Sequence, residues 1–377
     1  MLFPPLVLGL PWMVWIYKAL VLLVIACPCA LVVSTPVTVV SGLAAAAKAG
    51  ILIKGGIYLE EGRKLKSLAL DKTGTITQGK PLVTDVSVLS GEKGRALQLA
   101  AALAGRSDHP VSGAVSAFWK IESSGESILQ VSNVAAIIGR GVKGEIGGQQ
   151  YYLGNHRLVE ELKICTPDTE TALGKLEADG KTVVIICNDK TPLAVIGVAD
   201  TVRETSRQAI QELHELGIHT IMLTGDNELT AKAIAKNVGI DDARGNLLPE
   251  DKLAAVTEEL SRFGTVGMVG DGINDAPALA KASIGFAMGA AGTDTALETA
   301  DVALMDDDLR KIPQFVRLSR RTAAILKQNI ALALGIKLAF LVMAVMGLAT
   351  LWMAVFADMG ASLLVVFNGL RLVRKVK

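Results

Sequence analysis

The stretch Asp71-Lys72-Thr73-Gly74-Thr75 decides the fold, and a mostly apolar run from Leu65 to Leu70 precedes it. The apolar run predicts a buried strand, and Asp71 would lie at its carboxyl end, where ligands bind in open α/β sheets. A carboxylate there can attack the γ-phosphate of a nucleotide and form an aspartyl-phosphate. Gly74 and the two threonines would supply a tight turn with donors for phosphate oxygens. The complete pentapeptide favours this interpretation over an ordinary strand-ending aspartate.

Two further apolar runs end in polar clusters in the same way. Ile218–Leu223 precedes Thr224-Gly225-Asp226-Asn227, and Val266–Val269 precedes Gly270-Asp271-Gly272-Ile273-Asn274-Asp275. Helical patterns accompany these runs: Glu204–Leu216 lies before the first run, and Leu229–Val238 lies between the two. This alternation predicts a parallel, doubly wound sheet that brings all three clusters to one edge.

The residues at this predicted edge suit phosphoryl transfer. Asp71 and Asp271 can share a Mg²⁺ ion, which prefers carboxylate oxygens and water as ligands. Thr224 can donate a hydrogen bond to a phosphoryl oxygen, and Lys252 can neutralise the charge spread over the transferred group. Taken alone, Lys252 would be a surface lysine at a helix start and Asp226 a turn residue. The combination of these residues along one sheet is specific for phosphoryl transfer.

Residues 81–193 interrupt the sheet after its first strand, which leaves residues 49–80 and 194–316 for the phosphorylation domain. Helical patterns over Arg95–Ala104 and Val111–Ile121, with several short strands and glycine turns, predict an inserted α+β domain. The short strands are expected at Gly144–Gly147, Gln150–Leu153 and Thr182–Cys187. Its candidate ligand features are Ser107-Asp108-His109-Pro110 and Gly139-Arg140-Gly141, each of which is weak alone.

Part of the chain belongs in a membrane, because hydrophobic residues make up 51% of it and the mean hydropathy is +0.43. A span needs about 20 apolar residues. Three stretches qualify: Trp12 to Val40 in residues 1–48, and Asn329 to Leu348 and Thr350 to Leu370 in residues 317–377. Lysines and arginines flank these stretches, and the positive-inside rule places residues 48–327 and the C-terminus in the cytoplasm.

Charge, cysteine content and the first residues exclude several classes of protein. Lys+Arg 38 against Asp+Glu 37 gives no basic surface, so no nucleic-acid partner is expected. Four cysteines, two of them in an apolar segment, do not form a secreted disulfide framework. Leu2 to Leu10 is too short to span a membrane and lacks the charged start of a signal peptide. We expect it to be the tail of a helix in a larger membrane protein.

With these motifs in this order, the chain resembles the P-type ATPases over essentially all of its length. The resemblance implies a haloacid-dehalogenase-like phosphorylation domain, ATP as substrate and phosphorylation of Asp71. It also implies roles for the other residues of the three clusters and for Lys252. Asp71, the Thr73 carbonyl and Asp271 would hold Mg²⁺ with support from Asn274 and Asp275, and Lys252, Thr224 and Asp226 would complete the catalytic set.

Cys27-Pro28-Cys29 within the first span indicates a subfamily. The proline removes a helix hydrogen bond and frees carbonyls, which is tolerated only where the backbone is buried in protein or lines a cavity. Cys27 and Cys29 would then be a soft ligand pair for Zn²⁺, Cd²⁺, Pb²⁺ or Cu⁺. The alternative is two buried small hydrophobic residues. This feature resembles the heavy-metal-transporting P-type ATPases.

The resemblance to that class also implies a nucleotide site in the inserted domain. His109, Gly139, Gly141, Gly154 and Asn155 match the residues that bind the adenine nucleotide in the class. One position departs from the pattern, because the class usually has a glutamate five residues before the histidine and this chain has Ala104. Adenine recognition is therefore expected to be weaker or to rest on different residues.

Lys337 and Asp358 lie within the last two predicted spans, where ionisable residues are costly and usually functional. Asp358 could bind a divalent ion, and Lys337 could pair with Asp358 when the ion is absent; the alternative is a structural ion pair. Asn329 with Lys337, and Asp358-Met359-Gly360, are similar to the zinc/cadmium/lead branch. The prediction is ATP-driven export of Zn²⁺, Cd²⁺ or Pb²⁺ across a bacterial plasma membrane, with a copper(I) exporter as the near alternative.

Two further hypotheses differ in the class of protein. The first is a soluble phosphohydrolase of the haloacid dehalogenase superfamily, which would usually carry a second aspartate at the position of Thr73 as general acid/base. Since this chain has threonine there, its phosphoenzyme is expected to persist. The second is a non-transporting metal- or ATP-binding fragment, because the family's actuator domain is not found in the 377 residues. We expect the chain alone to bind ATP and become phosphorylated without completing transport, and a separate polypeptide could supply the actuator domain.

Overall fold

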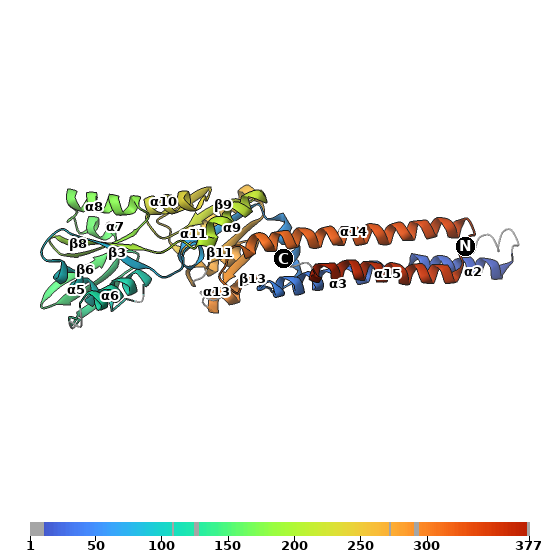
Figure 1. Cartoon of the computed structure of the whole chain (residues 1–377), viewed down its shortest axis with the longest axis horizontal. Helices are drawn as coiled ribbons and strands as arrows, with labels where there is room; N and C mark the ends of the chain where they lie inside the picture. Colours follow the sequence, from blue (N-terminus) through green and yellow to red (C-terminus); the bar gives the residue numbers. More distant parts are fainter. Residues whose placement is uncertain (1–10, 108, 124–127, 271–272, 290–293, 375–377) are drawn as a thin grey trace. The chain divides into compact units, whose positions relative to one another are not determined.

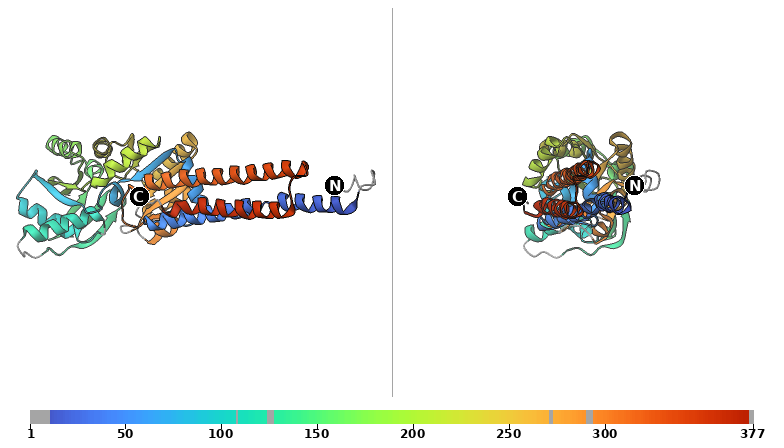
Figure 2. Two further views of the ribbon diagram at one scale, coloured as in Figure 1. Left: turned by 45° about the vertical axis from the view of Figure 1, so that its right-hand side comes forward. Right: turned by 90° about the vertical axis from the view of Figure 1, so that its right-hand side faces the viewer.

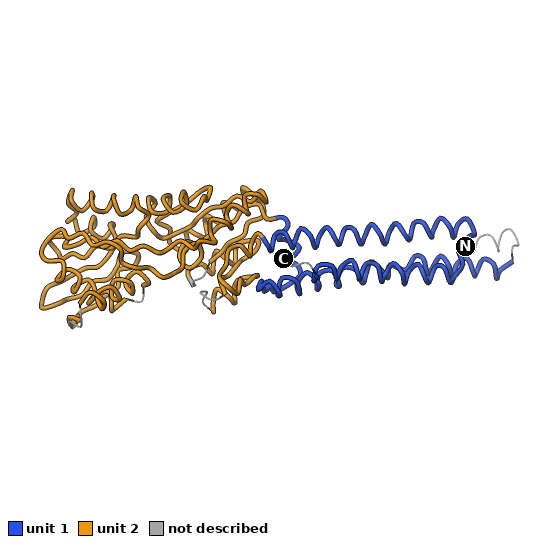
Figure 3. Tube along the Cα trace, viewed as in Figure 1, with its two compact units in different colours: residues 1–64, 314–377 blue, residues 65–313 orange. Residues whose placement is uncertain are grey.

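The computed structural model describes residues 11–107, 109–123, 128–270, 273–289 and 294–374. The chain divides into two compact units, which are coloured separately in Figure 3. We call residues 1–64 with 314–377 the helical unit and residues 65–313 the α/β unit.

A parallel sheet positions the candidate site in the α/β unit. Within the α/β unit, its strands follow the order β13, β12, β11, β2, β9, β10. Their bounds are β2 (Ser67–Asp71), β9 (His219–Leu223), β10 (Asp242–Arg244), β11 (Val266–Gly270), β12 (Ile284–Met288) and β13 (Val302–Leu304). Every residue of β2 and β11 is buried, as expected for central strands of a parallel sheet that is covered on both faces.

The register of this sheet confirms that the strand ends meet at one edge. Leu70 of β2 lies beside Met222 of β9 and Val269 of β11, so the residues after these three strands are neighbours. Helices connect the strands, and their bounds are α9 (Glu204–Glu215), α10 (Glu228–Val238), α11 (Pro249–Phe263), α12 (Ala276–Lys281) and α13 (Asp294–Thr299). The predicted doubly wound α/β architecture is correct.

The inserted domain has an antiparallel sheet of its own, in the order β3, β8, β7, β6, β5, β4. The strand bounds are β3 (Leu82–Val88), β4 (Ser132–Ile137), β5 (Gly141–Ile146), β6 (Gln149–Gly154), β7 (Thr182–Asn188) and β8 (Pro192–Ala199). The helix bounds are α5 (Lys93–Ala104), α6 (Pro110–Glu122), α7 (His156–Glu161) and α8 (Pro167–Ala178).

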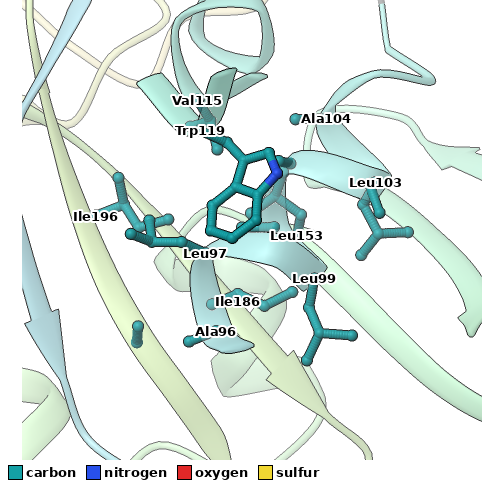
Figure 4. Packing of buried hydrophobic residues seen from close by; sticks show 14 of the residues in the cluster. Ala96, Leu97, Leu99, Leu103, Ala104, Val115, Trp119, Leu153, Ile186 and Ile196 are labelled. Carbon is teal, nitrogen blue, oxygen red and sulfur yellow. The ribbon is translucent and has the colours of Figure 1, made fainter. Parts of the chain in front are cut away.

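One hydrophobic core of the inserted domain lies between α5, α6 and this sheet. Figure 4 shows the Trp119 ring of α6 among apolar side chains such as Leu97 of α5 and Leu153 of β6. Alanines between the leucines of α5 keep its buried face thin, which lets the helix pack closely on its neighbours. Burying Trp119, which is 4% exposed, stabilises the domain because aromatic side chains carry large apolar areas.

The inserted domain ends later than the sequence indicated. The predicted boundary at residue 193 falls inside β8, which continues to Ala199 and pairs with β3 as far as Leu82. An antiparallel strand extends as far as its partner offers hydrogen bonds, and this length is not visible in the local sequence.

The helical unit contains long apolar helices. Their bounds are α2 (Trp12–Ala26), α3 (Cys29–Lys48), α14 (Lys311–Val345) and α15 (Leu351–Arg374), and the unit also holds β1 (Ile51–Ile53) and α4 (Gly56–Glu61). Within the described residues, three segments are long and apolar enough to cross a membrane: Trp12–Lys48, Lys311–Val345 and Leu351–Arg374. The helix α15 runs alongside α2 and α3 in Figures 1 and 2. The first predicted span is interrupted at Cys27-Pro28, where α2 ends before α3 begins.

Candidate active site

A buried lysine joins two carboxylates at the carboxyl edge of the parallel sheet. Lys252 Nζ lies 2.5 Å from Asp71 Oδ1 and 2.8 Å from Asp275 Oδ1. Asp71 ends β2, Lys252 is in the first turn of α11, and Asp275 immediately precedes α12. The backbone N–H of Leu248 donates to Asp251 Oδ2 at 2.9 Å, which fixes the start of α11 and therefore the position of Lys252. All three charged side chains are buried.

The electrostatics of this cluster favour an additional positive charge. Burial raises the pKa of Asp71 to about 6; Lys252 opposes this rise and the Asp275 carboxylate adds to it. Burial lowers the pKa of Lys252, but Asp71 and Asp275 outweigh that effect and hold the pKa above its usual range. Two carboxylates thus share one buried ammonium group. A second cation would relieve the remaining negative charge.

This donor set fits Mg²⁺, because Asp71 and Asp275 offer carboxylate oxygens, the ligands that this ion prefers. Asn274 belongs to the same turn as Asp275 and is exposed. Thr73 lies in the turn that follows Asp71, with an extended backbone (φ −77°, ψ 131°). The predicted ligand Asp271 lies outside the described residues.

A second, partly buried cluster lies around Asp226. Its carboxylate pairs with Lys72 and accepts hydrogen bonds from Thr182 Oγ1 at 3.0 Å and Thr224 Oγ1 at 3.2 Å. Burial pushes the pKa of Asp226 upward, but Lys72 and the hydrogen bonds outweigh it and hold that pKa below its usual range. Thr224 and Asp226, both predicted at this edge, are therefore in direct contact. Thr182 begins β7, so the inserted domain is hydrogen-bonded to the phosphorylation sheet here.

Four of the predicted nucleotide residues lie together at the ends of β5 and β6. Gly141 pairs with Gly154 in the register of these strands, and Asn155 Nδ2 donates to the Gly139 carbonyl at 3.0 Å. Gly141 has φ 150°, and a Cβ there would collide with the Leu153 backbone. The glycines thus allow two backbones to approach closely, which leaves peptide groups of the loop near the surface for a ligand.

His109 is in a different setting from the glycine loop. It caps α6, and its Nδ1 accepts from the Val111 backbone N–H at 3.3 Å. Burial lowers the pKa of His109, which also responds to the charges of Asp226 and Lys72. The histidine is therefore within electrostatic reach of the phosphorylation edge. Ala104, where the resemblance leads one to expect glutamate, is buried in the hydrophobic core of the inserted domain.

The helical unit brings together the predicted residues of the transported-ion site. Lys337 Nζ lies 3.7 Å from Asp358 Oδ1, and it donates to the carbonyls of Ile25, at 2.9 Å, and Cys27. These carbonyls adjoin Pro28, which interrupts the helix as expected from its missing N–H. Cys27 and Cys29 are paired as a disulfide in the structure, whereas the predicted metal ligands require both as thiolates.

Comparison with known proteins identifies the family. Residues 65–283, which include Asp71 and Lys252, match the family model described as haloacid dehalogenase-like hydrolase. The chain belongs to the haloacid dehalogenase-like hydrolases. The matched region contains the strand β2 with Asp71 at its end and the helix α11 with Lys252.

Relatives of this haloacid dehalogenase-like chain include metal-transporting ATPases. It is 49% identical to a Staphylococcus aureus "Cadmium-transporting ATPase" over 98% of the chain and 52% of the relative. It is 45% identical to the Escherichia coli (strain K12) "Zinc/cadmium/lead-transporting P-type ATPase" over 99% of the chain and 50% of the relative. The chain therefore spans about half the length of the curated relatives it matches.

A solved structure supports the same relationship. The crystal structure of a zinc-transporting PIB-type ATPase in its E2.Pi state matches 99% of this chain and 60% of its own chain. The TM-score is 0.77 and the sequence identity is 43%. Both the haloacid dehalogenase-like sheet and the apolar helices of this chain thus have counterparts in a P-type ATPase.

Several residues that shape the site were not predicted from the sequence. Asp200 Oδ2 accepts from Thr77 Oγ1 at 2.6 Å, and Arg203 donates to the carbonyls of Thr77 at 2.9 Å and Gly74 at 3.1 Å. These contacts tie the turn after Asp71 to the segment where the chain returns from the inserted domain. The sequence offered one signal for these contacts: two charged residues, Asp200 and Arg203, follow directly after the apolar run of β8.

Proposed function

We propose that this chain carries the ATP-dependent phosphorylation machinery of a P-type ATPase that exports divalent heavy-metal ions. The observation that carries the proposal is the buried contact of Asp71 with Lys252 at the carboxyl edge of the sheet. The identity of 45–49% to cadmium- and zinc-transporting ATPases supports the substrate class. The chain spans about half the length of these relatives. Export of the ion is therefore proposed for a whole protein of their length, and phosphorylation for this chain.

The proposed reaction begins with ionised Asp71. A carboxylate oxygen of Asp71 attacks the γ-phosphorus of ATP, a new P–O bond forms, and the bond to the β-phosphate oxygen breaks as ADP leaves. Lys252 neutralises negative charge on the transferred group, and Thr224 lies beside the same edge to donate to a phosphoryl oxygen. Thr73 cannot act as a general base toward water, so the phosphoenzyme should persist long enough to drive a conformational step.

Asp71, the Thr73 carbonyl, Asp271 and Asp275 would hold Mg²⁺ in this proposal, with Asn274 as support. Bound there, the ion supplies electrostatic stabilisation of the phosphoryl oxygens. Asp226 would hold Lys72 and Thr224 in place, since it contacts both. The loop of Gly139, Gly141, Gly154 and Asn155 would bind the nucleotide together with His109.

The transported ion would bind between the helices of the helical unit. Cys27 and Cys29, once reduced, offer soft sulfur ligands, and Asp358 offers a hard carboxylate. Lys337 would replace the ion as the partner of Asp358 when no ion is bound, an exchange supported by their 3.7 Å separation. A carboxylate in the site favours Zn²⁺, Cd²⁺ or Pb²⁺ over Cu⁺, which prefers neutral or sulfur ligands.

The three candidate spans support an integral membrane protein, and we propose the bacterial plasma membrane as its location. The charges beside the spans would place residues 48–327 and the C-terminus in the cytoplasm, where ATP is available. The comparisons lend no support to a separate polypeptide with an actuator domain.

The metal assignment is tested by stimulation of ATP hydrolysis in membrane vesicles that contain the protein. Asp358→Ala should abolish stimulation by Zn²⁺ and Cd²⁺, because it removes the charged ligand and the carboxylate that pairs with Lys337. Met359→Ala is a matched control, since Met359 is adjacent and 61% exposed, and it should retain stimulation. Undiminished zinc stimulation in Asp358→Ala, or stimulation by Cu⁺ alone in the unmodified protein, would contradict the assignment.

A further inference from the structure

Three different metal-ligating side chains converge on the inserted domain, away from the phosphorylation cluster. His156 Nε2 lies 2.8 Å from Glu170 Oε1, and Cys165 Sγ lies 3.1 Å from the same oxygen. Cys165 Sγ and His156 Nε2 are 3.7 Å apart, and the three ligand atoms all lie within 4.8 Å of one another. Glu160 Oε1 is a possible fourth ligand, 3.9 Å from His156 Nε2.

The backbone holds these side chains together. His156 begins α7 and Glu170 lies in α8, and Cys165 is in the short connection between the two helices. Thr166 caps α8 by accepting from the Thr169 backbone N–H at 3.3 Å. Lys163 adopts φ 56°, which reverses the chain and returns Cys165 toward α7. The ligands therefore meet because of the local fold and not by chance extension of long side chains.

Their accessibility and chemistry suit a soft or borderline divalent ion. The His156 side chain is 25% exposed and that of Glu170 is 53% exposed, so an ion can reach them from solvent. Imidazole nitrogen, thiolate sulfur and carboxylate oxygen are the ligands that Zn²⁺ uses in tetrahedral sites, and Cd²⁺ shares the preference for sulfur. Mg²⁺ and Ca²⁺ are disfavoured, because they prefer oxygen ligands alone.

We propose that His156, Cys165 and Glu170 form a binding site for Zn²⁺ or Cd²⁺ on the inserted domain. On binding, the Cys165 thiol proton is released to solvent, the Sγ–metal bond forms, and the hydrogen bond from Cys165 to Glu170 is replaced by coordination of both groups. Glu160 or water completes the four-coordinate shell. The site shares no residue with the proposed transported-ion site or with the cluster of Asp71, Lys252 and Asp275.

The proposed metal site lies next to the loop that contains Gly139 and Gly141. Asn155 directly precedes His156 and donates to the Gly139 carbonyl, and Arg140 Nε donates to Glu161 Oε1 of α7 at 2.8 Å. These two contacts attach the helix α7 to the glycine loop. A bound ion would be held by His156, the first residue of that helix.

The test titrates the purified full chain with Cd²⁺ under reducing conditions and follows the ultraviolet absorption of the Cd²⁺–thiolate bond. Replacing Cys27 and Cys29 by serine first removes their sulfur from the measurement. We expect one thiolate-bound Cd²⁺ per chain, and loss of the band in Cys165→Ser. Cys187→Ala is the matched control, because Cys187 is buried in β7 and the band should remain.

Two further variants test the remaining ligands. His156→Ala and Glu170→Gln should each weaken Cd²⁺ binding about tenfold or more, as loss of groups in a metal site commonly does. Glu170 is largely exposed, so Glu170→Gln keeps the test valid even if another variant fails to fold. A thiolate band that survives Cys165→Ser, or unchanged Cd²⁺ affinity in His156→Ala and Glu170→Gln, would overturn the proposal.

Discussion

At the scale of single residues, Lys252 determines whether two buried carboxylates can coexist at the edge of the sheet. It is the ammonium group that contacts both Asp71 and Asp275 at hydrogen-bond distance. Removing one partner from a buried ion pair leaves an uncompensated charge, and such losses are large compared with the net stability of a domain. The same residue is placed to meet a phosphoryl group, so its structural and chemical contributions can be separated only by different measurements.

We expect Lys252→Met to lower stability by about 3–5 kcal/mol when divalent ions are removed. Millimolar Mg²⁺ should restore part of the loss, because a cation can replace the missing positive charge. Thermal unfolding in detergent, with and without Mg²⁺, measures both effects. Lys232→Met is the control: Lys232 is 64% exposed in a surface pair with Glu228, and its loss should change stability by less than about 0.5 kcal/mol. Equal losses in the two variants would count against the buried cluster.

The raised pKa of Asp71 predicts a pH dependence of stability. The pKa rises from 3.8 to about 6 on folding, so the folded chain binds this proton more tightly than the unfolded chain. The resulting stabilisation is complete below pH 3.8 and is lost as the pH rises through about 6. In the presence of EDTA, Asp71→Asn should therefore gain stability relative to the unmodified chain over this range. A difference between the two chains that does not vary with pH would contradict the raised pKa.

At the scale of elements, the pairing of β5 with β6 depends on glycine where the two backbones come closest. Gly141 and Gly154 are opposite each other, and side chains at these positions would meet main-chain atoms that cannot move aside. The loop that contains Gly139 and the start of α7 both depend on this pairing, because Asn155 links them.

Gly141→Ala should destabilise the inserted domain and weaken nucleotide binding. The positive φ alone costs about 1–2 kcal/mol, and the collision with the Leu153 backbone adds to it. Gly148→Ala is a matched control, since Gly148 also has a positive φ (77°) but no atom within 4 Å of an added Cβ. Thermal unfolding compares the stability of the two variants, and calorimetric titration with ATP compares their nucleotide affinity. Similar effects of both substitutions would mean that the close approach of the strands is unimportant.

At the scale of the whole molecule, the sequence predicted the sheet edge well because strand burial and polar strand ends are local patterns. It could not predict the pairing of Lys72 with Asp226 or the contact of Thr182 with Asp226, since these join residues from distant segments. The extension of β8 to Ala199 depends on its partner β3, again a non-local cause. The His156–Cys165–Glu170 cluster was also missed, because its ligands belong to no recognised spacing pattern.

The proposed activity of the chain is transfer of the γ-phosphate of ATP to Asp71. Among the described residues of the catalytic cluster, Asp71 combines a strand-end carboxylate with direct contact to Lys252. Transfer to Asp71 should therefore label one side chain among the acidic residues of the protein. Asp168, an exposed aspartate in the first turn of α8, provides a control for the loss of a carboxylate as such.

The most direct test incubates the purified chain with Mg²⁺ and ATP labelled at the γ-phosphate, quenches in acid and measures protein-bound label. We predict an acid-stable label that hydroxylamine removes, as expected for an acyl phosphate, and that is absent in Asp71→Asn but retained in Asp168→Asn. Label that persists in Asp71→Asn, in a variant that remains folded, would contradict the account.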